Sequence, residues 1–446
     1  MEPHYPTIAE SDAWWERALE VIPAGTQTYS KGPYQFVLGL SPKYLDRGKG
    51  CHVWDVDGNR YVDYNMACQP ITLGYCDPDV DAAIRAQLDK GITFSTMHPL
   101  EVEVAEKIVE MVPCAEAVRF GKNGADATSA AVRVSRAITG REHIAYCGYH
   151  GWHDWYIANT DLNSGIPTFN QQLGHAFSFN DLDSLQQVFE EYPGKIACVI
   201  MEPVQVSPPK PGFLEQVRQM THENGALLIF DEIITGFRFA EGGAQQLFGV
   251  TPDLACFAKG MSNGMPVSAV TGRKQYMQAL EKTFFSFTYG GECLSLAAAK
   301  AAMNKVQTHG VIPFLYAMGE RLQSGINRLA DDNGVGEFIK CVGFPCRTIM
   351  SYNGAGRFDP AEIKTFFQQE LTKRDILCNG YHSMSFAHDE AVIDQTLEAY
   401  EDTIKAFKAV VDRNVPLASE LEGPVIRPVF KRIADFMAQQ TKKSGG

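Results

Sequence analysis

Short apolar runs that alternate with amphipathic helical patterns constrain the fold of this chain more than any other feature. The runs are nearly continuous in hydrophobic side chains and are bounded by turn residues, which is typical of strands covered on both faces of a sheet. They are AVRF (117–120), HIAYC (143–147), ACVIM (197–201), ALLIF (226–230), LACFA (254–258) and VSAV (267–270). Helical patterns such as DLDSLQQVFEEY and FLEQVRQMTHENG separate most of them. This alternation predicts an α/β fold with a largely parallel sheet.

The segments on either side of these runs predict a second, smaller domain. Residues 51–64 form an expected hairpin, because two runs rich in Val, Tyr and Trp flank an Asp-Gly pair. After about residue 305, longer amphipathic helices at 313–332 and 389–413 alternate with irregular strands. A chain of 446 residues is long enough for two or three domains.

We therefore predict three parts of the chain. Residues 1–65 are an N-terminal segment that joins the small domain, and residues 66–310 are the large domain. Residues 311–446 complete the small domain and end in a flexible tail, TKKSGG.

The composition of the chain disfavours several classes of binding partner. The formal net charge is −13, from 53 acidic and 40 basic residues, which disfavours binding to nucleic acid or to an anionic membrane surface. The N-terminus lacks the pattern of a signal peptide, and no apolar window is long enough to span a membrane, so we expect a cytoplasmic protein. The 11 cysteines include no C-x-x-C pair, and His150 and His153 lack further ligands, so we expect neither disulfides nor a metal site.

Two charged residues stand at the ends of predicted strands. ALLIFDEIITGFR runs an apolar strand directly into Asp231, and Lys259 follows the strand LACFA. In open α/β sheets the carboxyl edge of the strands is where ligands bind. The two side chains are expected at that edge, either as a structural ion pair or as parts of a ligand site.

Two further segments favour the ligand site. In GKNGADATSAAVRVSRAITG (121–140) a strand ends in a glycine turn and a helix begins, so that free backbone N–H groups can hold a phosphate. In CGYHGWHDW (147–155) an aromatic side chain follows a strand and a glycine, where it can stack on a planar ring. A phosphate cup, an aromatic ring, a buried carboxylate and a strand-end lysine are together the parts that hold pyridoxal 5′-phosphate (PLP).

At these motifs the sequence resembles the class III aminotransferases of fold type I, and within them the branch of glutamate-1-semialdehyde aminomutases. The resembling stretches include PAGTQTYSKGP, WDVDGNRYVDY, MEPV, FDEIITGFR, FAKGMSNGMPVSAVTG and FSFTYGGE, spread over about residues 20–410. The resemblance implies a mainly parallel, seven-stranded type of sheet covered by helices, plus a smaller α+β domain built from both termini. It also implies PLP as the cofactor.

The resemblance further implies roles for four side chains around the cofactor ring. Lys259 forms the Schiff base with the cofactor aldehyde and then moves the substrate proton, for which it must become a neutral amine. Asp231 keeps the pyridine nitrogen protonated, so that the ring accepts electrons. Tyr149 stacks on one face of the ring and Ile233 packs against the other.

Other implied contacts concern the phosphate and a second subunit. Asn123, Gly124 and Ala125 match the Ser-Gly-Thr turn of the family, and here both hydroxyl residues are replaced. Backbone donors survive that replacement, and the amide of Asn123 can supply a side-chain contact. Thr288 corresponds to a threonine that reaches the phosphate of the neighbouring subunit's cofactor, which implies a homodimer.

For three residues the sequence leaves two possible roles open. Glu202 in MEPV and His150 match family positions near the cofactor, where a purely structural role is an equal alternative. Arg238 in TGFR either binds a substrate carboxylate or forms a salt bridge.

The reaction also has alternatives. We predict amino transfer from glutamate to a sugar-derived aldehyde or ketone, such as an 8-oxo octulosonate, because CGYHGWHDWYIANTDLNSG and GTQTYSKGPYQF offer polar edges and flat apolar faces. The alternatives are the internal amino shift of an aminomutase and a protein that has the cofactor fold without catalysis.

Overall fold

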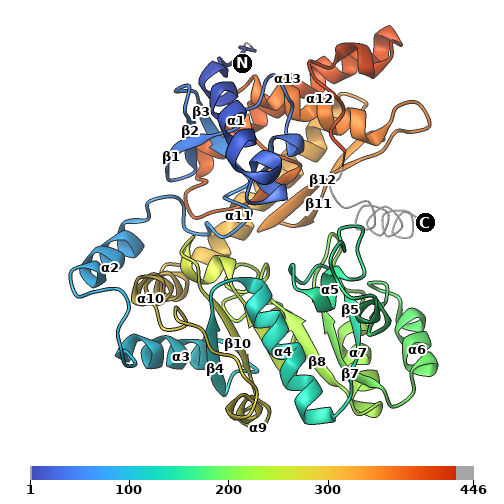
Figure 1. Cartoon of the computed structure of the whole chain (residues 1–446). Helices are drawn as coiled ribbons and strands as arrows, with labels where there is room; N and C mark the ends of the chain where they lie inside the picture. The colour runs from blue at the N-terminus through green and yellow to red at the C-terminus, as the bar shows by residue number, and fades with distance from the viewer. Residues whose placement is uncertain (1–2, 428–446) are drawn as a thin grey trace. The chain divides into compact units, whose positions relative to one another are not determined.

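The computed structural model describes residues 3–427, so the predicted flexible tail lies outside the described residues (Figure 1). The chain divides into two compact units. Of the described residues, one unit comprises Pro78–Ile312, and the other combines residues 3–77 with residues 313–427. The sequence places the corresponding divisions at residues 65/66 and 310/311.

The unit Pro78–Ile312 is built on a seven-stranded sheet with the order β4-β10-β9-β8-β7-β5-β6. The strands are β4 (Ala117–Gly121), β5 (His143–Cys147), β6 (Gly174–Ala176), β7 (Ile196–Met201), β8 (Leu227–Asp231), β9 (Leu254–Phe257) and β10 (Ser268–Gly272). Neighbours from β9 through β8, β7 and β5 to β6 are parallel. Every residue of β7, β8, β9 and β10 is buried, as strands covered on both faces must be. The predicted α/β fold is confirmed.

Strand β10 runs antiparallel to both of its neighbours, β9 and β4. A parallel crossover needs a dozen or more residues. The connection from β9 to β10 covers only residues 258–267, and it is occupied by the short 3-10 helix η5 (Lys259–Ser262). The chain therefore turns back at the carboxyl end of β9, and this turn begins at Lys259.

Helices of this unit pack on the sheet, and α4 (Gly124–Thr139) lies against β10, β9 and β7 (Figure 1). The unit also contains α2 (Pro78–Leu88), which packs on α10 (Cys293–Thr308), together with α3 (Pro99–Met111), α5 (Asp154–Ile157), α6 (Leu182–Glu191), α7 (Phe213–Glu223), α8 (Ala244–Phe248) and α9 (Lys274–Met277). Within residues 3–427, no helix is both long and apolar enough to cross a bilayer.

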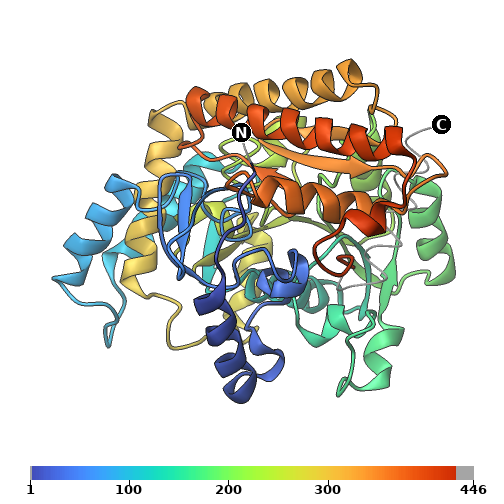
Figure 2. The same ribbon diagram turned by 90° about the horizontal axis from the view of Figure 1, so that it is seen from above.

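The other unit contains two small sheets. The predicted hairpin is confirmed as β2 (His52–Asp55) and β3 (Arg60–Asp63), which pair with β1 (Leu45–Lys49) and β13 (Ile376–Leu377). The second sheet joins β11 (Ile339–Phe344), β12 (Arg347–Tyr352) and β14 (Tyr381–Ser383). Helices α12 (Pro360–Thr372) and α13 (Glu390–Arg413) pack against each other in the orange and red part of Figure 2. Helix α1 (Ala9–Val21) precedes the first sheet, and α11 (Val311–Asp332) spans the boundary between the units.

After β3, four successive residues without a glycine have positive φ: Met66, Ala67, Cys68 and Gln69. Each residue in the left-handed region costs about 1–2 kcal/mol, so the run needs compensation from its surroundings. The buried carboxylate of Asp63 accepts the N–H of Asn65 at 2.8 Å and the hydroxyl of Tyr75 at 2.7 Å. Burial raises the pKa of Asp63, and the hydrogen bonds from Tyr75 and from the backbone of residues 65–67 oppose that rise.

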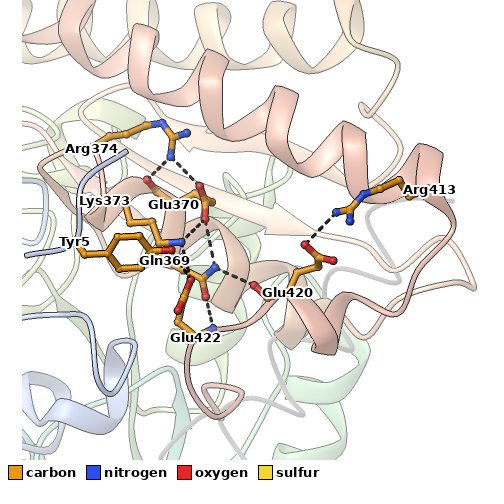
Figure 3. Close-up of polar contacts among 8 residues, drawn as sticks. All are labelled: Tyr5, Gln369, Glu370, Lys373, Arg374, Arg413, Glu420 and Glu422. Carbon is orange, nitrogen blue, oxygen red and sulfur yellow. Dashed lines mark hydrogen bonds and ion pairs between the residues drawn. The ribbon is translucent and has the colours of Figure 1, made fainter. Parts of the chain in front are cut away.

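An ionic cluster ties the N-terminal and C-terminal segments of this unit to helix α12 (Figure 3). Its centre is Glu370, whose Oε1 accepts Lys373 Nζ at 3.0 Å and whose Oε2 accepts Arg374 at 2.8 Å. Lys373 Nζ also contacts Glu422 Oε1 at 2.9 Å, and the ring of Tyr5 lies 4.7 Å from the same nitrogen. The remaining members shown in the figure are Gln369, Arg413 and Glu420.

Replacing Glu370 by Gln should destabilise the protein by about 3 kcal/mol, because two partly desolvated cations lose their shared carboxylate. Glu401→Gln is the matched control, since Glu401 pairs with Lys405 on the solvent side of α13 and its loss should cost under about 0.5 kcal/mol. Urea titrations measure both changes in the free energy of unfolding. Equal effects of the two substitutions would contradict a structural role for the cluster.

The same cluster predicts an acid-sensitive contribution to stability. Burial alone would raise the pKa of Glu370, but hydrogen bonds from Arg374 and Lys373 outweigh it and hold the pKa below the ordinary value of 4.5. A lowered folded-state pKa stabilises the fold above the ordinary pKa, and this stabilisation disappears as the pH falls through the folded-state value. The difference in stability between wild type and Glu370→Gln should therefore shrink below pH 4.5.

Candidate active site

The parallel pair β8 and β9 brings the two predicted key residues to one edge of the sheet. Asp231 is the last residue of β8 and lies opposite Cys256 of β9. Lys259 follows β9 after Ala258, at the same carboxyl edge. Its φ of 42° places a non-glycine residue in the left-handed region, a conformation that costs about 1–3 kcal/mol and is found preferentially at functional sites.

Asp231 is held from two directions. His150 Nδ1 lies 2.8 Å from Asp231 Oδ2, and because an ionised carboxylate can only accept, the imidazole donates. The backbone N–H of Ile233 donates to Oδ1 at 3.1 Å. His150 is itself fixed by its backbone, since its carbonyl accepts the hydroxyl of Thr128 on α4 at 2.8 Å. These bonds fix the carboxylate in one orientation.

Tyr149 lies next to this pair, on a turn shaped by Glu202. The backbone N–H of Tyr149 donates to Glu202 Oε2 at 3.1 Å. Gly148 has a φ of 109°, and a Cβ on it would meet Glu202 Oε2 at 2.4 Å. Burial raises the pKa of the Tyr149 hydroxyl, and the nearby charges of Asp231 and Glu202 raise it further. Glu202 therefore positions the backbone that carries Tyr149.

The predicted phosphate turn is the first turn of α4. Asp126 Oδ2 accepts the backbone N–H groups of Lys122 at 2.9 Å and Asn123 at 2.7 Å, so the turn is closed by a carboxylate. Within residues 3–427, no hydrogen bond is made by the N–H groups of Gly124 and Ala125. A Cβ on Gly124 would meet Ile233 Cδ1 at 2.6 Å, so only glycine lets Ile233 approach the turn this closely.

These residues fit PLP. Two N–H groups at a helix N-terminus suit a phosphate, and the oriented carboxylate of Asp231 suits a protonated pyridine nitrogen. The close contact of Gly124 with Ile233 places an apolar side chain between the phosphate turn and Asp231. The end of β8 thus supplies both groups that the cofactor ring needs: the carboxylate of Asp231, which His150 supports, and the apolar side chain of Ile233.

Thr288 and Arg238 are two further residues that the sequence analysis predicts for the site. Thr288 is exposed in the loop between η6 (Gln278–Glu281) and α10, and within the described chain it has no hydrogen bond to the other predicted site residues. Arg238 is 1% exposed, and both of its interpretations stay predictions.

Glu232 is a buried carboxylate whose role the sequence analysis missed. It accepts the N–H groups of Ala244 at 2.7 Å and Gln245 at 2.9 Å, together with the hydroxyl of Thr235. Burial raises its pKa, and these hydrogen bonds oppose the rise. It anchors the segment directly after Asp231. The only signal in the sequence is a second acid immediately after an apolar strand.

Comparison with known proteins also indicates a PLP-dependent enzyme. Residues 40–350 match the family described as aminotransferase class-III. The chain belongs to this family, and it is a PLP-dependent enzyme of the transaminase and aminomutase type. The alternative of a protein that has the cofactor fold without catalysis is therefore not supported.

Relatives in the family carry different activities. The chain is 34% identical to a 3-aminobutyryl-CoA aminotransferase of Cloacimonas acidaminovorans, over 91% of this chain and 99% of that protein. It is 33% identical to a glutamate-1-semialdehyde 2,1-aminomutase of Aquifex aeolicus, over 89% and 99% respectively. Among solved structures, the FumI protein of Sphingopyxis sp. MTA144 with PLP superposes with a TM-score of 0.85 at 28% identity, covering 92% of this chain and 99% of that one.

Gly148→Ala should destabilise the protein and weaken its affinity for PLP, because the new Cβ displaces Glu202 and with it Tyr149. Gly165→Ala is the matched control, since Gly165 also has a positive φ of 84° but nothing lies within 4 Å of the added carbon. Backbone strain alone should cost each variant about 1 kcal/mol or somewhat more. Urea unfolding and PLP titration of both variants measure the difference, and identical losses would contradict the contact with Glu202.

Proposed function

We propose that this chain is a transaminase that takes the amino group from L-glutamate and delivers it to a small carbonyl acceptor. The observation that carries the proposal is the strand-end pair, Asp231 on β8 and Lys259 after β9, with His150 bonded to Asp231 at 2.8 Å. Membership of the class III family supports amino transfer as the reaction class.

Each residue has one task in this proposal. When bound, PLP supplies an aldehyde that captures amino groups and a ring that withdraws electrons from the substrate carbon. Asp231 holds a proton at the pyridine nitrogen, and His150 keeps the carboxylate aimed at it. Lys259 Nζ would take the proton from the carbon of the amino donor and would later supply a proton to the carbon of the acceptor. Tyr149 and Ile233 cover the two faces of the ring, and Gly124 and Ala125, with Asn123, hold the phosphate.

For the acceptor we propose a sugar-derived carbonyl such as an 8-oxo octulosonate, which would make the chain an 8-amino-3,8-dideoxy-manno-octulosonate transaminase acting in lipopolysaccharide synthesis. Support comes from the segment after β5, where Tyr149 is 46% and Trp152 67% exposed. Flat aromatic faces together with polar edges suit a polyhydroxylated chain.

Two other donor and acceptor assignments are favoured by specific relatives. The relative from Cloacimonas acidaminovorans acts on a 3-aminobutyryl thioester, which suggests a donor with its amino group on the β-carbon. The relative from Aquifex aeolicus is an aminomutase, which suggests an internal amino shift.

These assignments can be distinguished by mixing the holoenzyme with a candidate amino donor and no acceptor. With L-glutamate alone, we expect the cofactor absorbance to convert to that of the amino form, with one equivalent of 2-oxoglutarate per site. A 3-aminobutyryl thioester tested in parallel identifies a β-amino donor if it converts the cofactor faster. If glutamate-1-semialdehyde is isomerised while glutamate releases no 2-oxoglutarate, the transaminase assignment is wrong.

We also propose a homodimer in which Thr288 reaches the partner subunit's cofactor phosphate. The loop that carries Thr288 borders a groove of about 680 Å³ between α3 and β4, lined in part by Val102, Val109, Phe285 and Phe287. Val102 is 60% exposed and the neighbouring Tyr289 is 60% exposed, and such large apolar side chains at a groove are typical of an interface.

Thr288→Ala should therefore weaken PLP binding about tenfold through the loss of one hydrogen bond to a charged group, without changing the oligomeric state. Ser286→Ala, in the same exposed loop, is the control and should bind PLP as the wild type does. Sedimentation and PLP titration measure both properties. A monomeric holoenzyme, or a Thr288→Ala variant with unchanged affinity, contradicts the shared site.

A further inference from the structure

The segment after β5 is attached to the first turns of α4, the helix that begins at the predicted phosphate turn. Thr128 Oγ1 on α4 donates to the backbone carbonyl of His150 at 2.8 Å. Gly151 has a φ of 103°, and a Cβ on it would meet Ala125 Cβ at 2.6 Å, so only glycine allows the segment to lie this close to the turn. The segment is therefore held against α4 at two places before the chain reaches His153.

His153 is oriented by two further side chains. Its Nδ1 lies 2.6 Å from Ser129 Oγ on α4, and Trp155 Nε1 donates to the same oxygen at 2.9 Å. An indole nitrogen only donates, so the hydroxyl accepts from Trp155 and keeps its own hydrogen for another group. Within residues 3–427, Ser129 Oγ has no other hydrogen-bond partner, so it donates to His153 Nδ1.

These contacts determine the tautomer of His153. With Nδ1 as the acceptor, the hydrogen of the neutral ring is on Nε2. Nε2 lies 4.0 Å from Asp126 Oδ1, which is too long for a direct hydrogen bond but close enough for electrostatic attraction. The two side chains are 30% and 21% exposed, so solvent screens this attraction less than it does at the surface.

Asp126 is the carboxylate that closes the phosphate turn. Its Oδ2 accepts the N–H groups of Lys122 and Asn123, while the next two N–H groups, of Gly124 and Ala125, suit the phosphate. A phosphate at these two groups brings negative charge close to the carboxylate, and like charges repel. The hydrogen on His153 Nε2 faces the other oxygen of the carboxylate, Oδ1, and so offsets part of this repulsion.

We propose that His153, oriented by Ser129 and Trp155, is a positioning residue for the cofactor phosphate, because it holds Asp126 on the turn and offsets the charge of that carboxylate. The inference rests on the proposed function for the place of the phosphate at Gly124 and Ala125, and it concerns binding rather than turnover. Since the effect acts on the phosphate, it strengthens the binding of a phosphorylated ligand and leaves the binding of the bare ring unchanged.

Binding of pyridoxine 5′-phosphate and of pyridoxine to the full chain freed of cofactor, measured by calorimetry, tests the proposal. Neither ligand has an aldehyde, so neither reacts with Lys259. We expect the wild type to bind the phosphorylated ligand at least about tenfold more tightly. His153→Asn should reduce this preference about fivefold, because the shorter amide reaches Ser129 but not Asp126. His153→Gln should keep most of the preference, because its amide nitrogen lies near the position of Nε2.

His222→Asn is the matched control. His222 is on α7 of the same unit, and its Nε2 also faces a carboxylate, at 2.8 Å from Asp253 Oδ2. This variant should leave the preference for the phosphorylated ligand unchanged. If His153→Asn weakens the two ligands equally, or leaves the preference unchanged, the proposal is wrong. It is also wrong if His153→Gln loses as much of the preference as His153→Asn does.

Ser129→Ala is a second variant, which leaves His153 in place and removes the hydroxyl that orients it. We expect the preference for the phosphorylated ligand to fall about threefold. Heteronuclear NMR of labelled histidine should find the hydrogen of wild-type His153 on Nε2, and a hydrogen on Nδ1 instead contradicts the proposal. Near-ultraviolet circular dichroism reports whether each variant keeps the native fold. Wild-type preference in Ser129→Ala overturns the proposal even if His153→Asn does not fold.

The binding measurements distinguish this proposal from the proposed function. If L-glutamate does not convert the cofactor to its amino form, the transaminase assignment is wrong, while the two pyridoxine ligands still separate the variants. If the wild type binds pyridoxine 5′-phosphate no more tightly than pyridoxine, the positioning role of His153 is wrong, whichever amino donor the enzyme uses.

Discussion

The parallel pairing of β8 with β9 is the interaction on which the rest of the site depends. Because the two strands run in the same direction and in register, the carboxyl ends of these two fully buried strands place Asp231 and Lys259 at one edge of the sheet. The short connection to β10 then forces the chain to reverse at Lys259, and the positive φ of that residue is the local cost. The lysine is thus held by backbone geometry, while the aspartate is held by His150 and the N–H of Ile233.

Much of the fold followed from hydrophobic pattern alone, and the failures have physical causes. Strands such as β7 were predictable because every residue is apolar and buried. Strand β6 was missed, because Gly174-His175-Ala176 is short, polar and at the edge of the sheet. An apolar run carries no direction, so the antiparallel orientation of β10 was not predictable. The left-handed run at residues 66–69 contains no glycine and therefore gave no signal.

The site was predicted unevenly for similar reasons. Strand-end charges and glycine turns are local in sequence, so Asp231, Lys259 and the turn at Gly124 could be predicted as candidate site residues. Support from distant segments has no local signature. The bond between His150 and Asp231 and the closure of the phosphate turn by Asp126 became visible only in three dimensions. The match to class III aminotransferases supports the cofactor, and the roles of individual residues remain our proposals.

Attachment of PLP to Lys259 is the central claim, and reduction by borohydride followed by peptide mass spectrometry tests it most directly. We expect the reduced holoenzyme to carry one added phosphopyridoxyl group per chain, on the peptide that contains Lys259. Lys259→Ala, treated identically, should carry none. A wild-type protein that gains no mass in the presence of PLP, or that carries the group on another lysine, would contradict the account.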